Sequence, residues 1–449
     1  MNKPKVFTYF SIVLAIIVMI SACTTTPPQV TTQPAAPSEP QKIESTVIVE
    51  KVVTPTPGPK EPVTISFWHA YNADVEAKFL DETLIPAFEA AHPDIKVESV
   101  LVPYDQFRRK LLIALSGGSS PDVARLDIIW VPELADQGAL MNLDQDMPDF
   151  KTYSEQFLPG PLATNLYNGS HYGLPLDTNT RVLVYNIDML KAAGIADAPK
   201  TMEEFTAACE AIKQLGPDKY CFADGGTYAW AVNPWIWSFG GDVTDPTVTQ
   251  STGVYNGAQT VAAYQFLKDS LDNGYIHPGM TGGGLDTWGG FGQDQIAMIL
   301  EGPWFPPVFD KQFPGKAYGM ALMPAGAGGS VSVVGGEDIA IFQQSANKEA
   351  AIEFVKYMLS EEVQMQLVTV GQMPVLKSAG ENSVIKDHKF FGIFLEQLVS
   401  AKARTPHPNW SKIEEIMTNV GGEILAGKVE AQAGLDKAAA DIDALLPIK

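Results

Sequence analysis

Residues 104–127 have the sequence YDQFRRKLLIALSGGSSPDVARLD, in which a helix pattern, a break and a strand pattern follow one another directly. Apolar side chains recur at helical spacing at Phe107, Leu111 and Leu115, so we expect a helix that buries this face. The Gly-Gly-Ser-Ser-Pro run ends the helix, because glycine and proline interrupt regular structure. The Val-Ala-Arg-Leu run that follows predicts a strand, which carries Asp127 at its carboxyl end.

The same alternation extends in both directions from this stretch. Upstream, the pattern predicts strands at 63–67 and 95–100, with a helix between them that Asn72 caps and Pro86 kinks. Downstream, it predicts strands at 181–185, 318–323 and 337–342 and helices at 202–215, 261–271 and around 351–358. Strands that alternate with helices are typical of a parallel sheet, so we expect an α/β fold.

The length of the chain predicts two lobes. Single hydrophobic cores stop growing near roughly 250 to 300 residues. This chain has 449 residues, of which 45% are hydrophobic, so we expect two packed cores.

The N-terminal segment predicts a signal peptide over residues 1–22. Lysines precede an apolar run that is too short to span a membrane comfortably and that ends in small residues. Residues 20–23, Ile-Ser-Ala-Cys, resemble the box at which bacterial lipoproteins are cleaved and lipidated, with Ile in place of the usual Leu and Cys23 as the lipidated residue. The alternative is an ordinary signal peptide or a short membrane helix with an incidental cysteine. Residues 23–62 are rich in Pro and Thr and predict an extended tether to the membrane.

The charge of the chain restricts its partners. A net charge of −21 argues against nucleic acid or an anionic bilayer surface as the binding partner. The other interpretation of this charge is an acidic coat that keeps the protein soluble.

The sequence lacks the common signatures of catalytic and metal sites. It contains no His-Glu-x-x-His, no Gly-x-Ser-x-Gly, no Walker loop and no Gly-x-Gly-x-x-Gly after a strand. The histidines are scattered, and Cys209 and Cys221, which form either a disulfide or two buried thiols, do not have metal-ligand spacing. We therefore expect no enzyme, no metal and no cofactor. With 52 acidic residues, a glycosidase pair such as Asp127 and Glu301 stays open as an alternative.

Aromatic side chains next to single polar groups occur in loops and at predicted strand ends. They give the candidate ligand-binding residues Trp68, His69, Tyr104, Asp127, Trp130, Asp177, Thr178, Asn179, Trp235, Trp237, Glu301, Trp304, Gly336 and Glu337. In open α/β sheets, ligands bind beyond the carboxyl ends of the strands. The apolar C–H face of a sugar suits an indole, and its hydroxyl groups suit carboxylates and amides. The set therefore predicts a carbohydrate site. For Trp235 and Trp237, which alternate as strand residues do, the alternative is a place in the core.

Several motifs together resemble one known family. They are FWHAY at 67–71, FEAAHPDIKV at 88–97, PDVA at 121–124, YGLP at 172–175, LVYN at 183–186, AM at 297–298 with GPW at 302–304, and NKEA at 347–350. In order and spacing they are similar to the extracellular solute-binding proteins, family 1, the maltose-type sugar-binding group of ABC importers. The likeness runs from about residue 63 to the end of the sequence.

The resemblance implies a fold of the periplasmic-binding-protein type, with two α/β lobes joined by a hinge of crossing segments. It assigns 63–175 and about 337–380 to lobe 1, assigns 176–336 and about 385–449 to lobe 2, and places the crossings near 175–180, 334–336 and 375–390. It also implies ligand contacts at Tyr104, Asp127, Thr178, Asn179, Trp304, Gly336 and Arg404. Met373 stands where an aromatic residue is found in relatives, which leaves the size of the ligand open.

We therefore expect an extracytoplasmic lipoprotein that closes around a mono- or oligosaccharide and delivers it to the permease of an ABC transporter. We expect it to act as a monomer, anchored by lipid to the cell membrane in the periplasm or at the cell surface. One alternative keeps the fold but binds a glycerol phosphodiester or phosphate, with Arg404 holding the anion. The other is the secreted glycosidase.

Overall fold

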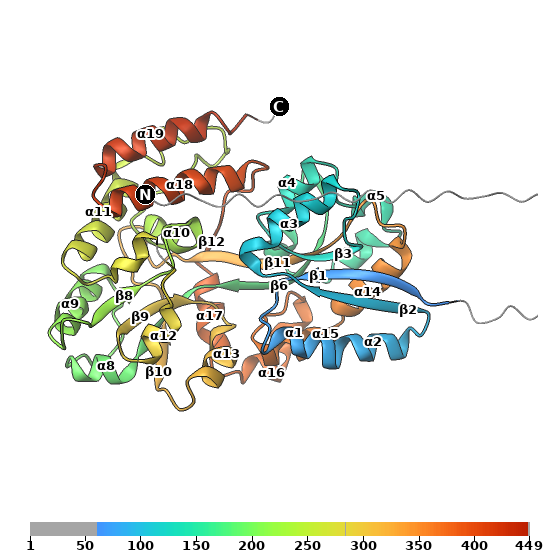
Figure 1. Cartoon of the computed structure of the whole chain (residues 1–449), viewed down its shortest axis with the longest axis horizontal. Helices are drawn as coiled ribbons and strands as arrows, with labels where there is room; N and C mark the ends of the chain where they lie inside the picture. The colour runs from blue at the N-terminus through green and yellow to red at the C-terminus, as the bar shows by residue number, and fades with distance from the viewer. Residues whose placement is uncertain (1–60, 283, 448–449) are drawn as a thin grey trace, which may run out of the picture. The chain divides into compact units, whose positions relative to one another are not determined.

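The computed structural model describes residues 61–282 and 284–447 (Figure 1). They fall in the second of two units into which the chain divides, residues 59–449. The expected signal peptide, the lipidated Cys23 and nearly all of the expected tether at 23–62 lie outside the described residues. Within the described part, each helix is too short or too polar to cross a membrane.

The first sheet is built around the strand predicted after the Gly-Gly-Ser-Ser-Pro run. In spatial order its strands are β12 (Lys402–Ala403), β11 (Val333–Ile341), β3 (Val123–Asp127), β1 (Val63–His69) and β2 (Ile95–Leu101), and β6 (Leu174–Thr180) also pairs with β11. The pairs β1–β2 and β1–β3 are parallel, as the strand–helix alternation predicted. β11 runs antiparallel to β3 and β6, so the sheet is mixed, and its register places Asp127 opposite Glu337.

The second sheet contains four strands of four to six residues. In spatial order they are β10 (Tyr318–Ala321), β7 (Val182–Asn186), β9 (Ile296–Glu301) and β8 (Tyr220–Ala223). β8 and β9 are parallel, and the other neighbours are antiparallel. A separate hairpin joins β4 (Leu166–Tyr167) to β5 (Ser170–His171) through Asn168 and Gly169, which both have positive φ as a tight hairpin turn requires.

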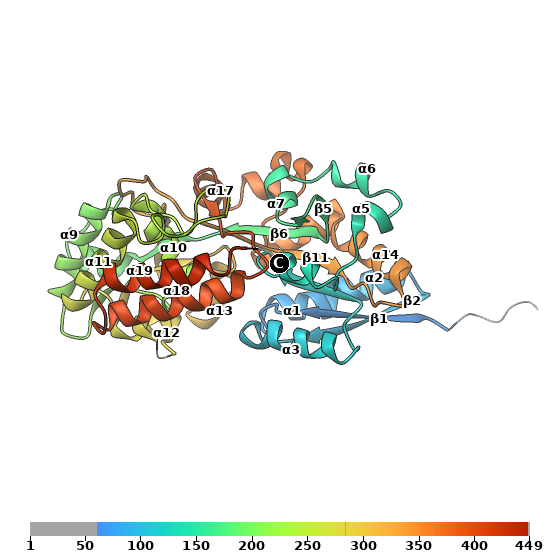
Figure 2. The same cartoon turned by 90° about the horizontal axis from the view of Figure 1, so that it is seen from above.

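Helices surround both sheets (Figures 1 and 2). The helices that the chain forms between or after strands of the first sheet are α1 (Glu76–Phe79), the π-helical turn η1 (Leu80–Leu84), α2 (Ile85–Ala91), α3 (Tyr104–Ser116), α4 (Val131–Asp136), α5 (Leu143–Asp146), α6 (Phe150–Ser154), α7 (Pro159–Ala163), α14 (Lys348–Met358), α15 (Glu361–Leu367), η3 (Val368–Val370) and η4 (Lys377–Glu381). The others are α8 (Ile187–Ala192), α9 (Met202–Lys213), α10 (Ala229–Ser238), α11 (Ala258–Asp272), η2 (Pro278–Thr281), α12 (Thr287–Gly292), α13 (Phe305–Gln312), α16 (Ser383–Lys386), α17 (Phe391–Leu398), α18 (Trp410–Leu425) and α19 (Ala431–Asp443).

The opening stretch of sequence folds as predicted. α3 buries Phe107 and Leu111, and it ends at two glycines, of which Gly118 has a φ of 68°. All of β3 is buried, and its alternate residues face opposite sides of the sheet, so that Val123 and Leu126 belong to different apolar clusters.

The chain passes between the two sheets along extended segments. β6 ends at Thr180 and β7 begins at Val182, so a single residue, Arg181, separates the first sheet from the second. β11 makes the return passage, and Figure 2 shows β6 and β11 running between the two groups of helices. At a third place Met373 forms a bridge to Thr178 before the chain continues to α16 and α17, which pack with β7.

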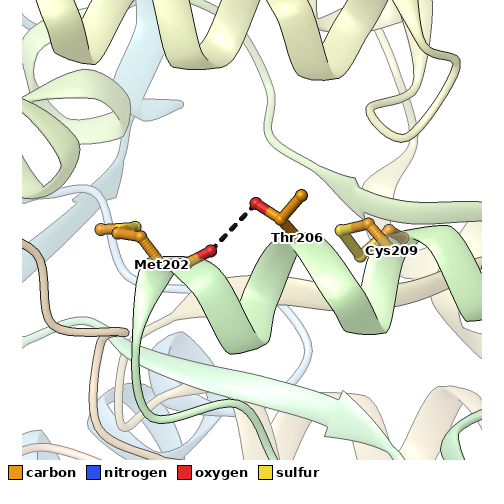
Figure 3. Close-up of a disulfide and its surroundings, with 4 residues drawn as sticks. Met202, Thr206 and Cys209 are labelled. Carbon is orange, nitrogen blue, oxygen red and sulfur yellow. Dashed lines mark hydrogen bonds between the residues drawn. A yellow bond between two sulfur atoms is a disulfide. The ribbon is translucent and has the colours of Figure 1, made fainter.

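A disulfide joins Cys209 of α9 to Cys221 of β8 (Figure 3). Of the two alternatives that the sequence left open for these cysteines, this is the one present in the structure. α9 begins after Thr201, whose side chain accepts the backbone N–H of Glu204 at 3.2 Å. One turn before Cys209, Thr206 donates a hydrogen bond to the carbonyl oxygen of Met202 at 3.0 Å (Figure 3). The disulfide therefore fixes a helix to the edge of the second sheet.

Candidate ligand-binding site

A cavity of about 460 Å³ is lined by residues from both groups of elements. The first sheet and its helices contribute Ala70, Asn72, Glu76, Tyr104, Arg125, Asp127, Asn179, Gly335, Gly336 and Glu337. The rest of the wall consists of Tyr228, Trp230, Trp288, Trp304, Val308, Gln372, Arg404 and Glu414. The predicted residues that the structure brings together in this wall are Tyr104, Asp127, Asn179, Trp304, Gly336, Glu337 and Arg404.

Asp127 is the centre of a hydrogen-bonded group in the wall. Its Oδ2 accepts the hydroxyl of Tyr104 at 2.5 Å, and its Oδ1 accepts Nη2 of Arg404 at 2.9 Å and the backbone N–H of Ile129 at 3.1 Å. Arg404 is buried, so its pairing with Asp127 is little screened by water. These contacts fix the position of both charged groups.

Arg125 organises a second charged group. Its Nη2 lies 3.1 Å from Oδ2 of Asp177 and 2.8 Å from Oε2 of Glu337, and its guanidinium lies 4.3 Å from the centre of the Tyr71 ring. Burial raises the pKa of Glu337 well above its ordinary value, and the nearby Asp177 adds to this shift while Arg125 opposes it. One cation therefore serves two buried carboxyl groups.

Trp230 and Trp304 form a stacked aromatic pair in the wall. Their rings stack with centroids 6.3 Å apart and planes inclined by 29°, and both side chains are half-buried. Arg404 lies 5.2 Å from the centre of the Trp230 ring. Gly302 provides the space for Trp304, because a Cβ at this position would lie 2.3 Å from the indole. The result is a flat apolar surface beside charged groups.

Three buried polar atoms of the wall have no hydrogen-bond partner among the described residues, and one of them, Oε2 of Glu337, forms the ion pair with Arg125. Two are left without a partner of either kind. They are Oδ1 of Asn179, whose residue is 4% exposed, and Nε of Arg404. Buried polar atoms are normally paired, because leaving one unpaired costs about 1 to 3 kcal/mol. One acceptor and one donor in residues of the wall are therefore unpaired.

Backbone packing explains the glycine in the middle of β11. Gly336 has a φ of 139°, and a Cβ there would lie 2.4 Å from the carbonyl oxygen of Asp177. A larger residue would separate β11 from β6 and move Glu337 away from Arg125.

Four predicted residues lie directly behind the wall. Asp177 holds Arg125, and Thr178 donates to the carbonyl oxygen of Gly335 at 3.4 Å. Trp130 stacks on the ring of Tyr104 at 5.3 Å, and Glu301 accepts Nε1 of Trp288 at 2.7 Å. The structure gives these four residues a supporting position.

Trp68 and His69 correct the sequence prediction, because neither lines the cavity. Trp68 packs edge-on against Phe107 with ring centroids 6.3 Å apart. His69 is fully buried, and its Nε2 lies 2.9 Å from the hydroxyl of Ser99. Both residues belong to β1, where they face the packed layers of the first sheet.

Trp235 and Trp237 require the same correction. Trp235 is fully buried against Phe205 and Phe222, and Trp237 is 3% exposed and donates Nε1 to Asp242 at 2.9 Å. Their segment is the helix α10, whereas their alternation suggested a strand. The alternative of a place in the core is the one that the structure shows.

Several wall residues were not singled out from the sequence. Trp230 lies in the same aromatic-rich stretch as Trp235, and Arg125 is the lone cation of an apolar strand, so both left a signal. The sequence contains no such signal for five other wall residues, because only the fold brings them to the cavity. They are Tyr228, Trp288, Glu76, Gln372 and Glu414.

Comparisons with known proteins place the chain in a family. The family described as bacterial extracellular solute-binding protein matches residues 72–365. A binding protein of Brucella abortus is 28% identical over 375 residues, which cover 81% of this chain and 89% of the relative.

Two solved structures are similar over most of the chain. The GacH receptor of Streptomyces glaucescens, solved unliganded and with acarbose, is 26% identical with a TM-score of 0.78, and the match covers 86% of this chain and 100% of that one. An ABC transporter solute-binding protein of Thermotoga lettingae, bound with α-D-tagatose, is 25% identical with a TM-score of 0.77 and the same two coverages, 86% and 100%. These matches confirm the two-lobe α/β fold. The two matched proteins are binding proteins, not enzymes. Because the family match extends over more than half of its length, the chain belongs to the bacterial extracellular solute-binding proteins.

Proposed function

We propose that the chain is the carbohydrate receptor of an ABC importer and that the sugar binds in the cavity described above. The observation that carries this proposal is the stacked pair Trp230 and Trp304 in one wall with Asp127, Asn179 and Arg404. Indole faces suit the C–H face of a sugar ring, and the polar groups suit its hydroxyls. The similar solved proteins, which hold acarbose and tagatose, support the same ligand class.

Neither the aromatic rings nor the polar groups of the wall supply the binding energy alone. A micromolar complex needs about 8 kcal/mol. Each aromatic contact adds roughly 0.5 to 1.5 kcal/mol beyond area burial. Hydrogen bonds to the hydroxyls and burial of the sugar must supply the rest, which favours closure of the lobes around the ligand. The sugar then shifts the population toward the closed form, because it makes more contacts there.

The partner and location belong to the same proposal. The family description is that of extracellular proteins, and the apolar leader with the box at 20–23 supports a lipid anchor at Cys23. The closed, loaded protein, acting as a monomer, would dock on the transmembrane subunits of the permease. The permease would then receive the sugar without chemical change.

A phosphate ester is disfavoured as the ligand by the charges of the wall. Arg404 is paired with Asp127, and Arg125 is paired with Asp177 and Glu337. An anionic ligand would therefore meet carboxyl groups wherever it meets an arginine. The glycosidase alternative is disfavoured because the family consists of binding proteins and Glu301 lies behind the wall.

A sugar titration tests this function. A thermal-shift screen of mono- and oligosaccharides finds the ligand, and calorimetry measures its affinity for the wild type and for Trp304→Ala. We expect the alanine variant to bind at least tenfold more weakly, because it removes one of the two stacked indoles from the wall. Trp304→Phe, which keeps a ring, should lose less. The proposal is wrong if no sugar stabilises the wild type, or if both variants bind the sugar as tightly as the wild type does.

A further inference from the structure

We propose that the carbohydrate taken by this cavity carries a positively charged amino group, so that the preferred ligand is an amino sugar. This inference rests on the proposed function and names the ligand class of the same site. Two independent features carry it. One is the imbalance of charge in the wall, and the other is a buried hydrogen-bond acceptor that has no donor.

Carboxyl groups outnumber cations in the described wall. It contains Arg125 and Arg404, and its acidic residues are Glu76, Asp127, Glu337 and Glu414. Asp127 and Glu337 each form an ion pair with one of the arginines, and Arg125 also holds Asp177 behind the wall. Within the described part of the chain, no ion pair involves Glu76 or Glu414. The described wall therefore has two more carboxyl groups than cations.

Neutral groups donate to the first of the two unmatched carboxyl groups. Glu76 is 7% exposed, and its oxygens accept the backbone N–H of Asn72 at 2.6 Å and the side-chain amide of Gln372. The charge of Arg404 opposes the rise in the pKa of Glu414 that burial causes, although the two residues form no ion pair. Burial raises the pKa of both carboxyl groups, because it removes water from their charged forms, and the charges of Arg125 near Glu76 and Arg404 near Glu414 offset this rise only in part. A cation on the ligand would compensate this charge.

The unpaired acceptor supports the same ligand. Asn179 lines the cavity while 4% exposed, and its Oδ1 has no donor among the described residues. An ammonium group carries three donors and no acceptor. It also favours aromatic faces, and the faces of Trp230 and Trp304 belong to the same wall. The open donor of the wall, Nε of Arg404, is left for a sugar hydroxyl.

Matched sugars test the inference on the purified full-length protein. Each set keeps one skeleton and changes one substituent: glucosamine, glucose and N-acetylglucosamine; the galactose series; and the β-1,4-linked dimers of the glucose series. We expect the amino member of at least one set to bind tenfold or more tightly than its hydroxyl and acetamido counterparts. If the neutral members bind as tightly or more tightly, the inference is overturned and the proposed function stands. If no sugar of any class binds, both fail.

One variant locates the charge effect. Glu414→Gln keeps the shape of the side chain and should weaken the amino sugar at least tenfold more than it weakens the neutral counterpart. Glu415→Gln, on an exposed neighbour in the same helix, is the matched control and should leave both affinities unchanged. Equal losses for amino and neutral sugars in Glu414→Gln would contradict a role for its charge.

Discussion

Asp127 is held in the cavity wall by an ion pair with Arg404. Its place at the carboxyl end of an apolar strand predicted a side chain that faces a ligand, and the structure places it in the cavity wall. Its main partner, Arg404, is 277 residues away along the chain. Local patterns do not contain such a pairing, so Arg404 entered the prediction through the family resemblance alone.

His69 predicts a dependence of stability on pH. Its Nδ1 faces the backbone N–H of Tyr71 at 3.4 Å, and burial, with a smaller effect of Arg125, lowers its pKa from 6.5 to about 3. Between these values the unfolded chain binds a proton that the folded chain does not bind. This residue therefore lowers the free energy of unfolding as the pH falls below 6.5, by about 1.4 kcal/mol per pH unit, and has no such effect above it.

The measurement compares how the free energy of unfolding changes with pH in the wild type and in His69→Gln. The comparison is needed because buried carboxyl groups with raised pKa values increase stability as the pH falls, which opposes the effect of His69. Urea unfolding at pH 7, 6 and 5 should show that His69→Gln loses less stability on acidification than the wild type does. Parallel pH profiles for the two proteins would contradict the assignment.

At the scale of the element, α10 explains the main error in the predicted site. Residues two apart share a face in a strand but lie about 200° apart on a helix, at roughly 100° per residue. Trp235 and Trp237 therefore diverge within α10, and both are buried. The residue of this helix that reaches the cavity is Trp230, which lies about 140° around the axis from Trp235. Pro234, the neighbour of Trp235, lies inside this helix, and the alternation of the tryptophans is typical of a strand. The local pattern therefore suggested the wrong kind of element.

The disulfide between α9 and β8 predicts a loss of stability without a loss of function. Cys209 and Cys221 are 12 residues apart, and closing a loop of this length restricts the unfolded chain by about 3 kcal/mol. The double variant Cys209→Ser/Cys221→Ser should therefore unfold at a lower urea concentration. Neither cysteine lines the cavity, so sugar affinity should change less than threefold. An unchanged unfolding midpoint would show that the disulfide does not stabilise the lobe.

At the scale of the whole molecule, the fold was more predictable than the site. Alternating strands and helices, together with ordered motifs such as those at 67–71 and 302–304, were enough to predict a two-lobe α/β protein. The antiparallel course of β11 was not predictable, because pairing partners far apart in the chain leave no local signal. The lobe boundaries near 175 and 336 and the ligand contacts remain predictions.

The most direct test of the account is a crystal structure of the protein with the sugar that stabilises it most in the thermal-shift screen. We expect a sugar ring in contact with the indole of Trp230 or Trp304, with its polar groups bonded to Asn179, Arg404 or Asp127. A sugar bound outside this cavity, or one whose ring touches neither indole, would contradict it.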